Sequence, residues 1–180
     1  MTSPSAIPLL IEPLSPTSSA ATIETARNLL REYGDFVLAS TGPARFCAAR
    51  LDGEIADPLD SYLSLGGELL LAFSDGQAAG CAGFRLLKGS VPEHACELKR
   101  MWVRPAFRAA GIGRKLAQAV IECAAAAGYE AIYLDTEPEA MPAALRLYQR
   151  LGFEDCANYS NDTVGGLRFL RRSLLPAASL

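Results

Sequence analysis

The sequence predicts an α/β fold in which helices pack on both faces of a mixed sheet. The chain has 180 residues, of which 50% are hydrophobic and 21% are charged, a composition typical of one globular domain with a sizeable core. Residues 68–87 are typical of two strands joined by an Asp-Gly turn. The second half of the chain then alternates strand-sized and helix-sized apolar segments, which indicates a mixed sheet covered by helices.

The first third of the chain carries fewer signals. An apolar segment predicts a first strand at 7–11, and apolar residues at helical spacing predict a helix over about 22–33. Residues 34–65 mix glycine and proline with short apolar groups, which favours two short helices and loops. No strong boundary interrupts this stretch, so we expect a single domain over residues 1–180.

The elements after residue 66 are better defined. Glycines at 128 and 152 mark the expected ends of two helices, as glycine commonly does just past a helix C-terminus. Strands are expected at 68–73, 77–87, 96–103, 131–135, 154–159 and 167–174, and helices at about 111–127 and 140–151.

Charge and cysteine usage argue against several classes of protein. The formal net charge is −3, whereas a nucleic-acid-binding domain usually has a clear basic excess, so we expect no nucleic-acid partner. No apolar run approaches the roughly 20 residues that cross a bilayer, so we expect no membrane association. Five scattered cysteines and one histidine (His94) predict neither a metal site nor a disulfide scaffold. Reduced cysteines in a cytoplasmic protein are the expected state.

Residues 97–114 carry the strongest chemical signal. A strand ends there at Val103, because Pro105 has no N–H for the ladder, and Arg-x-x-Gly-x-Gly over residues 108–113 leads directly into a helix. The first turn of a helix has unpaired N–H groups and a positive dipole end, and the two glycines let a ligand approach the backbone. With Arg114 adding charge, the segment predicts a cradle for a pyrophosphate; the alternative is a glycine-rich turn before a core helix.

The same segment resembles motif A of the GNAT N-acetyltransferase superfamily, in which Arg/Gln-x-x-Gly-x-Gly/Ala binds the pyrophosphate of acetyl-CoA. Residues 128–136 resemble the family's fifth strand, and residues 144–153 are similar to its A-x-x-LY-x-x-LGF signature. The resemblance covers about residues 66–175, the expected cofactor-binding core, and implies that residues 1–65 form the acceptor side. It implies mostly antiparallel N-terminal strands and a central parallel pair splayed by a bulge.

The resemblance also implies site residues. Tyr148 matches the tyrosine that protonates the leaving thiolate, and Glu97 matches the position of a general base in some members. The alternatives are a core tyrosine and a strand-end glutamate paired with Lys99 or Arg100. The implied acetyl-CoA ligands are the backbone of Met101, Trp102 and Val103 for the pantetheine and thioester, and Arg108, Ala109, Ala110, Gly111, Ile112, Gly113 and Arg114 for the pyrophosphate.

The leading hypothesis is therefore an acyltransferase that moves an acetyl group from acetyl-CoA to a primary amine of a small molecule or peptide. Direct attack in a ternary complex is expected, because nothing around Cys96 indicates the activated thiolate that an acyl-cysteine route needs. The alternatives are a non-catalytic acyl-CoA-binding or sensing module and, less favoured, a plain nucleotide-binding domain. The family often forms dimers, so a homodimer stays open. Polar residues at 158–162 either line the acceptor site or form a turn.

Overall fold

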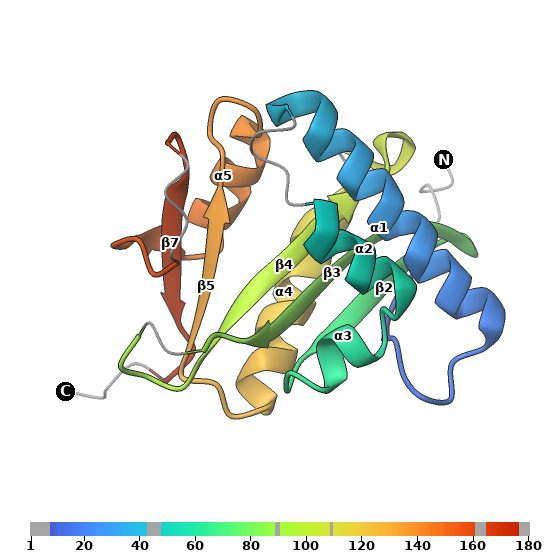
Figure 1. Cartoon of the computed structure of the whole chain (residues 1–180), viewed down its shortest axis with the longest axis horizontal. Helices are drawn as coiled ribbons and strands as arrows, with labels where there is room; N and C mark the ends of the chain where they lie inside the picture. The colour runs from blue at the N-terminus through green and yellow to red at the C-terminus, as the bar shows by residue number, and fades with distance from the viewer. Residues whose placement is uncertain (1–7, 43–47, 89–90, 109, 161–164, 177–180) are drawn as a thin grey trace, which may run out of the picture.

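A computed structural model describes residues 8–42, 48–88, 91–108, 110–160 and 165–176 (Figure 1). The elements in chain order are β1 (Leu9–Pro13), α1 (Ala20–Thr41), α2 (Ala48–Ala56), α3 (Asp60–Leu63), β2 (Glu68–Ser74), β3 (Gln77–Leu86), β4 (Ala95–Val103), the 3₁₀ turn η2 (Pro105–Phe107), α4 (Ile112–Ala126), β5 (Ala131–Thr136), α5 (Pro142–Arg150), β6 (Glu154–Asp155) and β7 (Arg168–Ser173).

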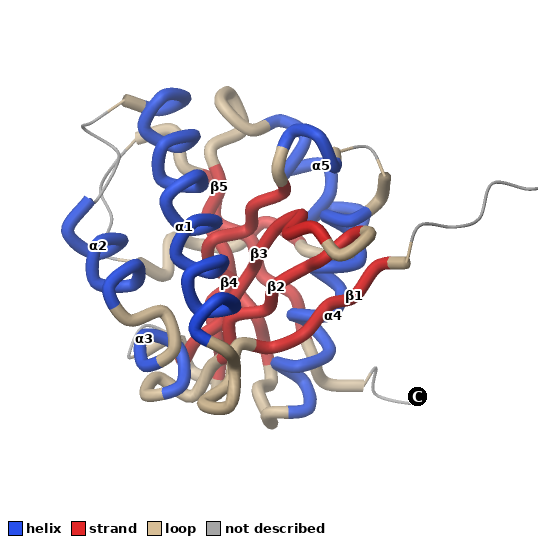
Figure 2. The backbone as a smooth tube through the Cα atoms, turned by 90° about the vertical axis from the view of Figure 1, so that its right-hand side faces the viewer, coloured by secondary structure: helices blue, strands red, loops and turns tan. Residues whose placement is uncertain are grey.

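The strands form one sheet in the order β1-β2-β3-β4-β5-β7-β6. Strands β4 and β5 are parallel, and the other pairs in the described residues are antiparallel. Helices cover both faces of the sheet, with α1 on one side and α4 on the other (Figure 2). The predicted fold class is therefore confirmed. In the part of the chain that is described, no helix is both long and apolar enough to span a membrane.

Two of the three apolar clusters in the described residues pack the helices against the sheet. One core packs α4 and α5 against the sheet and includes Leu116, Val120 and Ile132, none of which is exposed. The other packs α1, α2 and α3 against the opposite face, around Leu29 and Leu30 of α1. Burial of this kind stabilises a side chain by roughly 1.5–3 kcal/mol, so both faces of the central strands are fixed by packing.

The hairpin between β2 and β3 is the turn that the sequence predicts. Asp75 and Gly76 have φ values of 51° and 72°, the left-handed region that a tight two-residue hairpin turn requires. Register across the hairpin starts at Ser74–Gln77 and continues to Glu68–Phe84. The hairpin thereby fixes the position of β3, which is the partner of β4 on the side away from β5.

Three predicted boundaries are wrong. Helix α1 continues past Gly34, where the sequence suggests a stop, because Gly34 is buried and Phe36 packs against the core on this face. The first strand occupies Leu9–Pro13 rather than 7–11, and position 7 lies outside the described residues. The predicted strand at 154–159 contracts to Glu154–Asp155. The Asn158 side chain accepts a hydrogen bond from the Ser160 amide, which is turn chemistry.

Candidate functional site

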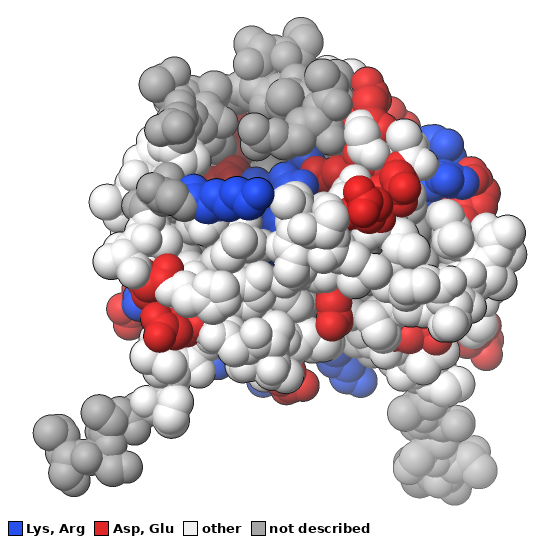
Figure 3. Space-filling view, turned by 60° about the horizontal axis from the view of Figure 1, so that its bottom comes forward, with Lys and Arg blue, Asp and Glu red and all other residues white. Residues whose placement is uncertain are grey.

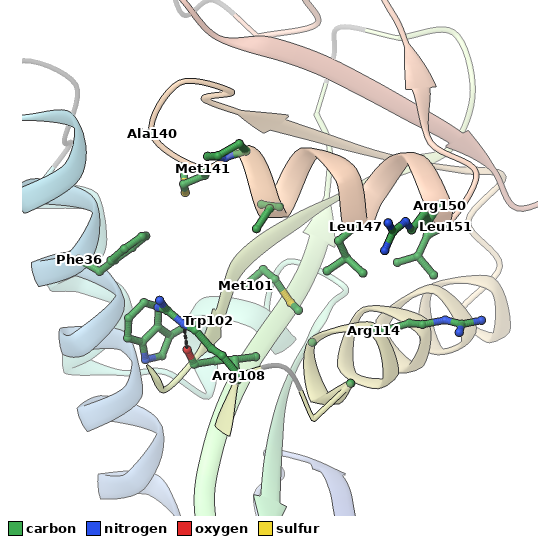
Figure 4. Close-up of a pocket in the computed structure, with 16 residues that line it drawn as sticks. Phe36, Met101, Trp102, Arg108, Arg114, Ala140, Met141, Leu147, Arg150 and Leu151 are labelled. Carbon is green, nitrogen blue, oxygen red and sulfur yellow. Dashed lines mark hydrogen bonds between the residues drawn. The ribbon is translucent and has the colours of Figure 1, made fainter. Parts of the chain in front are cut away.

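A cavity of about 910 Å³ opens between α1, the end of β4, the start of α4 and α5 (Figure 4). Its volume lies in the usual range for small-molecule sites. Seven of the ten predicted acetyl-CoA ligands line it: Met101, Trp102, Val103, Arg108, Gly111, Gly113 and Arg114. The remaining lining residues are Phe36, Ala140, Met141, Pro142, Ala143, Ala144, Leu147, Arg150 and Leu151. The cavity therefore joins the two sequence motifs that lie 30 residues or more apart in the chain.

Strands β4 and β5 diverge beside this cavity. Their parallel register covers Ala95–Ala131, Cys96–Ile132 and Glu97–Tyr133 and ends there. Figure 1 shows the two strands side by side at one end and separated at the other. The predicted splay is present, and Glu97 marks the point at which the strands part.

A bulge in β4 at Arg100 and Met101 follows the last β5 pair, at Glu97, after two further residues that pair only with β3. The register with β3 steps from Gly83–Lys99 to Cys81–Trp102, so two residues of β4 face one residue of β3. Arg100 is one of these two residues and has a φ of 57°, in the left-handed region that non-glycine residues rarely adopt. Met101 in the bulge and the two residues after it line the cavity.

The loop before α4 has the open backbone that an anion cradle requires. Gly111 is the N-cap of α4 with a φ of 76°, and no side chain caps the helix. A Cβ at Gly113 would lie 3.5 Å from Met101 Cε, so a side chain there would occupy the cavity wall. Free amides and the helix dipole at this end favour an anion. Ile112 is 4% exposed and packs in the core, so it can offer a ligand only its backbone.

The other predicted residues of this loop differ in their placement. Ala110 is exposed, and Ala109 lies outside the described residues. The Arg108 Nε donates a hydrogen bond of 3.0 Å to the Val103 carbonyl. Its guanidinium stands 4.9 Å from the Trp102 ring centroid, over the aromatic wall of the cavity. Arg108 thus lies at the Trp102 end, whereas Arg114 and Arg150 lie toward α5 (Figure 4).

Sequence reasoning missed Glu32 of α1, which fixes that aromatic wall. Its Oε2 accepts a hydrogen bond of 3.2 Å from the Trp102 indole, and its carboxylate pairs with Arg104 at 2.7 Å. Hydrogen bonding from Arg104 lowers the pKa of Glu32, so the carboxylate is charged at neutral pH. No local pattern marks this contact, because Glu32 and Trp102 are 70 residues apart.

Glu97 is held by one of its two carboxylate oxygens. Oε1 lies 2.7 Å from Lys99 Nζ and accepts a hydrogen bond of 2.9 Å from the Tyr159 hydroxyl. Within the described part of the chain, no hydrogen bond or ion pair reaches Oε2. Lys99 Nζ also lies 3.8 Å from Asp135 Oδ1 on β5, so the cluster bridges the opening between the strands. The sequence names Lys99 and Arg100 as cations that could pair with Glu97, and the structure pairs Glu97 with Lys99.

Tyr148 lies deeper than its neighbours on α5. It is 5% exposed, its ring packs 5.7 Å from that of Phe153, and it does not line the cavity. Burial raises the pKa of Tyr148, and electrostatic interaction with Tyr33 and Asp135 raises it further. Those two groups belong to α1 and β5, which border the strand opening. Among the described residues, none forms a hydrogen bond with the Tyr148 hydroxyl.

The cysteines and the histidine take no visible part in the site. Cys96 is fully buried, and burial raises the pKa of its thiol to about 12, so it is not a thiolate at neutral pH. The four cysteines within the described ranges, Cys81, Cys96, Cys123 and Cys156, are free. The His94 ring stacks on Tyr129 at 4.6 Å. Nowhere in the described residues do three potential metal ligands gather.

Charged side chains of both signs lie on the face of the molecule that Figure 3 shows. Acidic and basic side chains form small groups on this face, and wide uncharged areas separate the groups. The charged residues that line the cavity are Arg108, Arg114 and Arg150, and no carboxylate is among the described lining residues. Lys99 pairs with Glu97 and Arg104 pairs with Glu32 outside this lining. A ligand that enters the cavity therefore meets positive side chains, which favours an anion.

Comparison with known proteins gives consistent similarities. Residues 21–153 match the model described as the acetyltransferase (GNAT) family. An uncharacterized N-acetyltransferase of Schizosaccharomyces pombe is 31% identical over 122 residues, which cover 67% of this chain and 72% of that protein. The uncharacterized N-acetyltransferase YjgM of Escherichia coli is 38% identical over 80 residues, covering 44% of this chain and 47% of the other.

Solved structures show the same fold. A GNAT-family acetyltransferase of Staphylococcus aureus superposes with a TM-score of 0.71 at 20% identity, covering 93% of this chain and 100% of the other. The putative acetyltransferase yncA of Salmonella typhimurium, solved with acetyl-CoA, gives 0.68 at 23% identity, covering 95% and 96%.

Proposed function

Because this chain belongs to the acetyltransferase (GNAT) family, we propose that it is an N-acetyltransferase that moves an acetyl group from acetyl-CoA to a primary amine. The observation that carries the proposal is the splay of β4 and β5 beside the glycine-lined start of α4. A thioester and an amine can meet where the strands part, and the helix start can hold the diphosphate. The acceptor is an amine of a small molecule or peptide.

In this proposal, acetyl-CoA lies along the cavity between β4, α4 and α5. The backbone at Met101, Trp102 and Val103 receives the pantetheine and the thioester carbonyl, because β5 no longer pairs with this part of β4. The turn from residue 108 to Arg114 receives the pyrophosphate through its free amides. The similar yncA protein was solved with acetyl-CoA, and a similar N-acetyltransferase of Thermoplasma acidophilum was solved with coenzyme A, which supports this co-substrate.

Glu97 is the proposed general base. Attack on a thioester requires a neutral amine, so a carboxylate near the acceptor must remove a proton directly or through water. Lys99 and Tyr159 hold Oε1, which leaves Oε2 to take that proton. The position at the last β4–β5 pair puts this carboxylate at the mouth of the opening. The nearby Asp135 carboxylate adds attraction for an incoming ammonium ion.

Tyr148 is the proposed proton donor to the departing sulfur. Its raised pKa keeps the hydroxyl protonated at neutral pH, and the hydroxyl is free to donate because no described residue accepts its proton. The carbonyl carbon gains the bond to nitrogen and loses the bond to sulfur. An ammonium acceptor loses two protons: Glu97 takes one and releases it to solvent, and the other replaces, through solvent, the proton that Tyr148 gives to the thiolate. The raised pKa of Cys96 favours this direct transfer over an acyl-cysteine intermediate.

The competing interpretation is a module that binds acyl-CoA without transferring the acyl group. Both interpretations use the same cavity, whereas Glu97 Oε2 and the Tyr148 hydroxyl, neither of which has a hydrogen-bond partner among the described residues, favour the enzyme. We propose one domain in which residues 1–65 form the acceptor side and residues 66–175 the cofactor side. The position of Phe36 on the cavity wall supports that division.

Release of free CoA in the presence of a panel of amines tests the proposal. The panel contains amino acids, polyamines, aminoglycosides and peptide N-termini, each incubated with acetyl-CoA and protein. We expect acceptor-dependent CoA release that disappears in Glu97→Gln, with acetyl-CoA binding measured in parallel by calorimetry. Binding without transfer to any amine would favour the non-catalytic module, and no binding at millimolar acetyl-CoA would contradict both interpretations.

A further inference from the structure

A buried carboxylate lies behind the β4 bulge and takes no direct part in the reaction described above. Glu54, on α2, is 2% exposed. Its two oxygens accept hydrogen bonds of 2.8 and 2.9 Å from the Nε and Nη2 of Arg100. Arg85 Nη1 of β3 lies 3.2 Å from Oε1, and the Tyr62 hydroxyl donates to Oε2 at 3.0 Å. Glu54 therefore joins α2, α3, β3 and β4.

Arg100 is the residue that gives the bulge its shape. Its φ of 57° is unfavourable for an L-residue, and such conformations persist where the surroundings impose them. The bidentate contact with Glu54 holds the guanidinium on one side, and the Tyr33 ring lies 5.5 Å away on another. Met101, the next residue, begins the backbone segment proposed to receive the thioester. The contact between Glu54 and Arg100 thus acts one residue away from the backbone proposed to receive the thioester.

Stability alone is a poor explanation for this arrangement. A buried ion pair often contributes little net stability compared with apolar side chains of similar volume. A glycine at position 100 would adopt the same φ without a tether. The pair instead fixes the direction of the Arg100 side chain, whose guanidinium binds Glu54 on α2. The strand end that follows Arg100 is thereby held in one position relative to the cavity.

We infer that Glu54 is a positioning residue for acetyl transfer, which acts through Arg100 to hold the β4 bulge and the amides that follow it in the geometry that receives the thioester carbonyl. The inference rests on the proposed function, because it assigns the same backbone to the thioester. The inference gives a role to Glu54, a residue of helix α2 on the acceptor side. Glu54 lies 46 positions from Arg100 in the sequence, and no motif marks it.

The first test uses Glu54→Gln, which keeps the shape of the side chain and removes its charge. A shift of about 1 Å in a reacting group can lower a rate by about 100-fold, so we expect kcat to fall by about 10- to 100-fold. The Kd for free CoA should change by less than about 3-fold, because the diphosphate turn lies elsewhere, whereas acetyl-CoA should lose affinity relative to CoA. Asp155→Asn is the matched control, since it breaks an exposed pair with Arg168 on β7.

The second variant protects the test against a simple folding defect. Arg100→Gly accepts the unusual φ and leaves Glu54 paired with Arg85 and Tyr62. We expect it to fold and to show the same kinetic defect as Glu54→Gln, and Arg100→Lys to recover part of kcat. Amide hydrogen exchange at residues 100–102 should accelerate in both Glu54→Gln and Arg100→Gly by a larger factor than in β2, whose amides report the change in global stability.

The outcomes separate the two proposals. Wild-type protein that acetylates no amine contradicts the proposed function, while hydrogen exchange and the acetyl-CoA to CoA affinity ratio still decide the role of Glu54. Active wild-type protein whose kcat is unchanged in Glu54→Gln overturns the inference. Equal losses of CoA and acetyl-CoA affinity, with exchange at residues 100–102 accelerated no more than in the rest of the sheet, would also overturn it, because they indicate a general structural role.

Discussion

The hydroxyl of Tyr159 donates a hydrogen bond of 2.9 Å to Oε1 of Glu97, so a residue from the segment after β6 orients a carboxylate on β4. Tyr159 is buried, and burial followed by the charge of Glu97 raises its pKa, which keeps the hydroxyl a donor. Lys99 contacts the same oxygen. The carboxylate thus has one fixed oxygen and one that faces no protein partner among the described residues, an orientation suited to accepting a proton from a ligand.

Tyr159→Phe should lower kcat without weakening CoA binding. The change removes a hydrogen bond worth about 1 kcal/mol and leaves Glu97 with Lys99 alone, so the carboxylate gains freedom. One kilocalorie corresponds to about a 5-fold effect on the rate, if it is fully expressed in the transition state. Steady-state kinetics and calorimetry with CoA give the two quantities. A rise in the Kd for CoA with unchanged kcat would contradict this role for Tyr159.

Glu97→Gln should abolish most of the transfer. General base catalysis usually contributes about 100- to 10,000-fold, and an amide cannot accept the proton. The neutral glutamine keeps the size of the side chain and can still accept from Tyr159, so the fold should survive. We expect kcat to fall by at least about 100-fold, with part of the loss recovered at alkaline pH where the amine is neutral. Unchanged activity across pH would assign the base to another group.

The local features of the site are predictable from sequence, whereas its long-range contacts are not. The glycines at 111 and 113 show by themselves that the backbone before α4 is open. The pair between Glu54 and Arg100 joins residues 46 positions apart, and the left-handed conformation of Arg100 has no glycine to mark it. Periodicity reports only the faces of one element, so contacts between elements need the tertiary structure.

The bulge also changes which side chains face each core. Leu98 belongs to the core under α4, and so do Met101 and Val103, although strict alternation would put odd and even positions on opposite faces. Trp102 belongs to the other core, where Glu32 reaches it. One extra residue at the bulge accounts for this change of face. Alternation along residues 96–103 would have placed Trp102 beside Leu98.

Tyr148→Phe should reduce kcat and leave CoA affinity nearly unchanged. The hydroxyl makes no hydrogen bond within the described residues, so its removal costs the fold little. Burial raises the pKa of Tyr148, so the folded protein keeps this proton above the ordinary value of about 10. Between pH 7 and 10 the wild-type rate should therefore show no decline from ionisation of Tyr148. A decline over that range that disappears in Tyr148→Phe would contradict the raised pKa.

Gly113→Leu should block acetyl-CoA binding while the protein stays folded. A Cβ at this position makes ordinary contacts of 3.5 to 3.8 Å with Met101, Val103 and Leu147, all of which line the cavity. A leucine would extend beyond its Cβ into that space, whereas alanine would not. We expect no calorimetric binding for Gly113→Leu and a Tm close to wild type, with Gly113→Ala as the control. Full acetyl-CoA affinity in Gly113→Leu would show that the co-substrate does not bind against this wall of the cavity.

The stability that Glu54 contributes should depend on pH. Burial opposes ionisation of Glu54, but its contacts with Arg100 and Arg85 outweigh that effect and lower its pKa below the ordinary value of 4.5. A carboxyl whose folded pKa is lowered stabilises the protein fully above its unfolded pKa and loses that contribution as pH falls through the folded pKa. Removing one partner of a buried pair costs about 3 to 5 kcal/mol, so Glu54→Gln should be destabilised by an amount in that range at pH 7. The difference in the free energy of unfolding between wild type and Glu54→Gln should shrink below pH 4.5, because protonated Glu54, like glutamine, has no charge to pair with Arg100. Urea unfolding of both proteins at pH 7, 5, 4 and 3 measures it, and a difference that stays constant down to pH 3 would show that Glu54 is not charged in the folded protein.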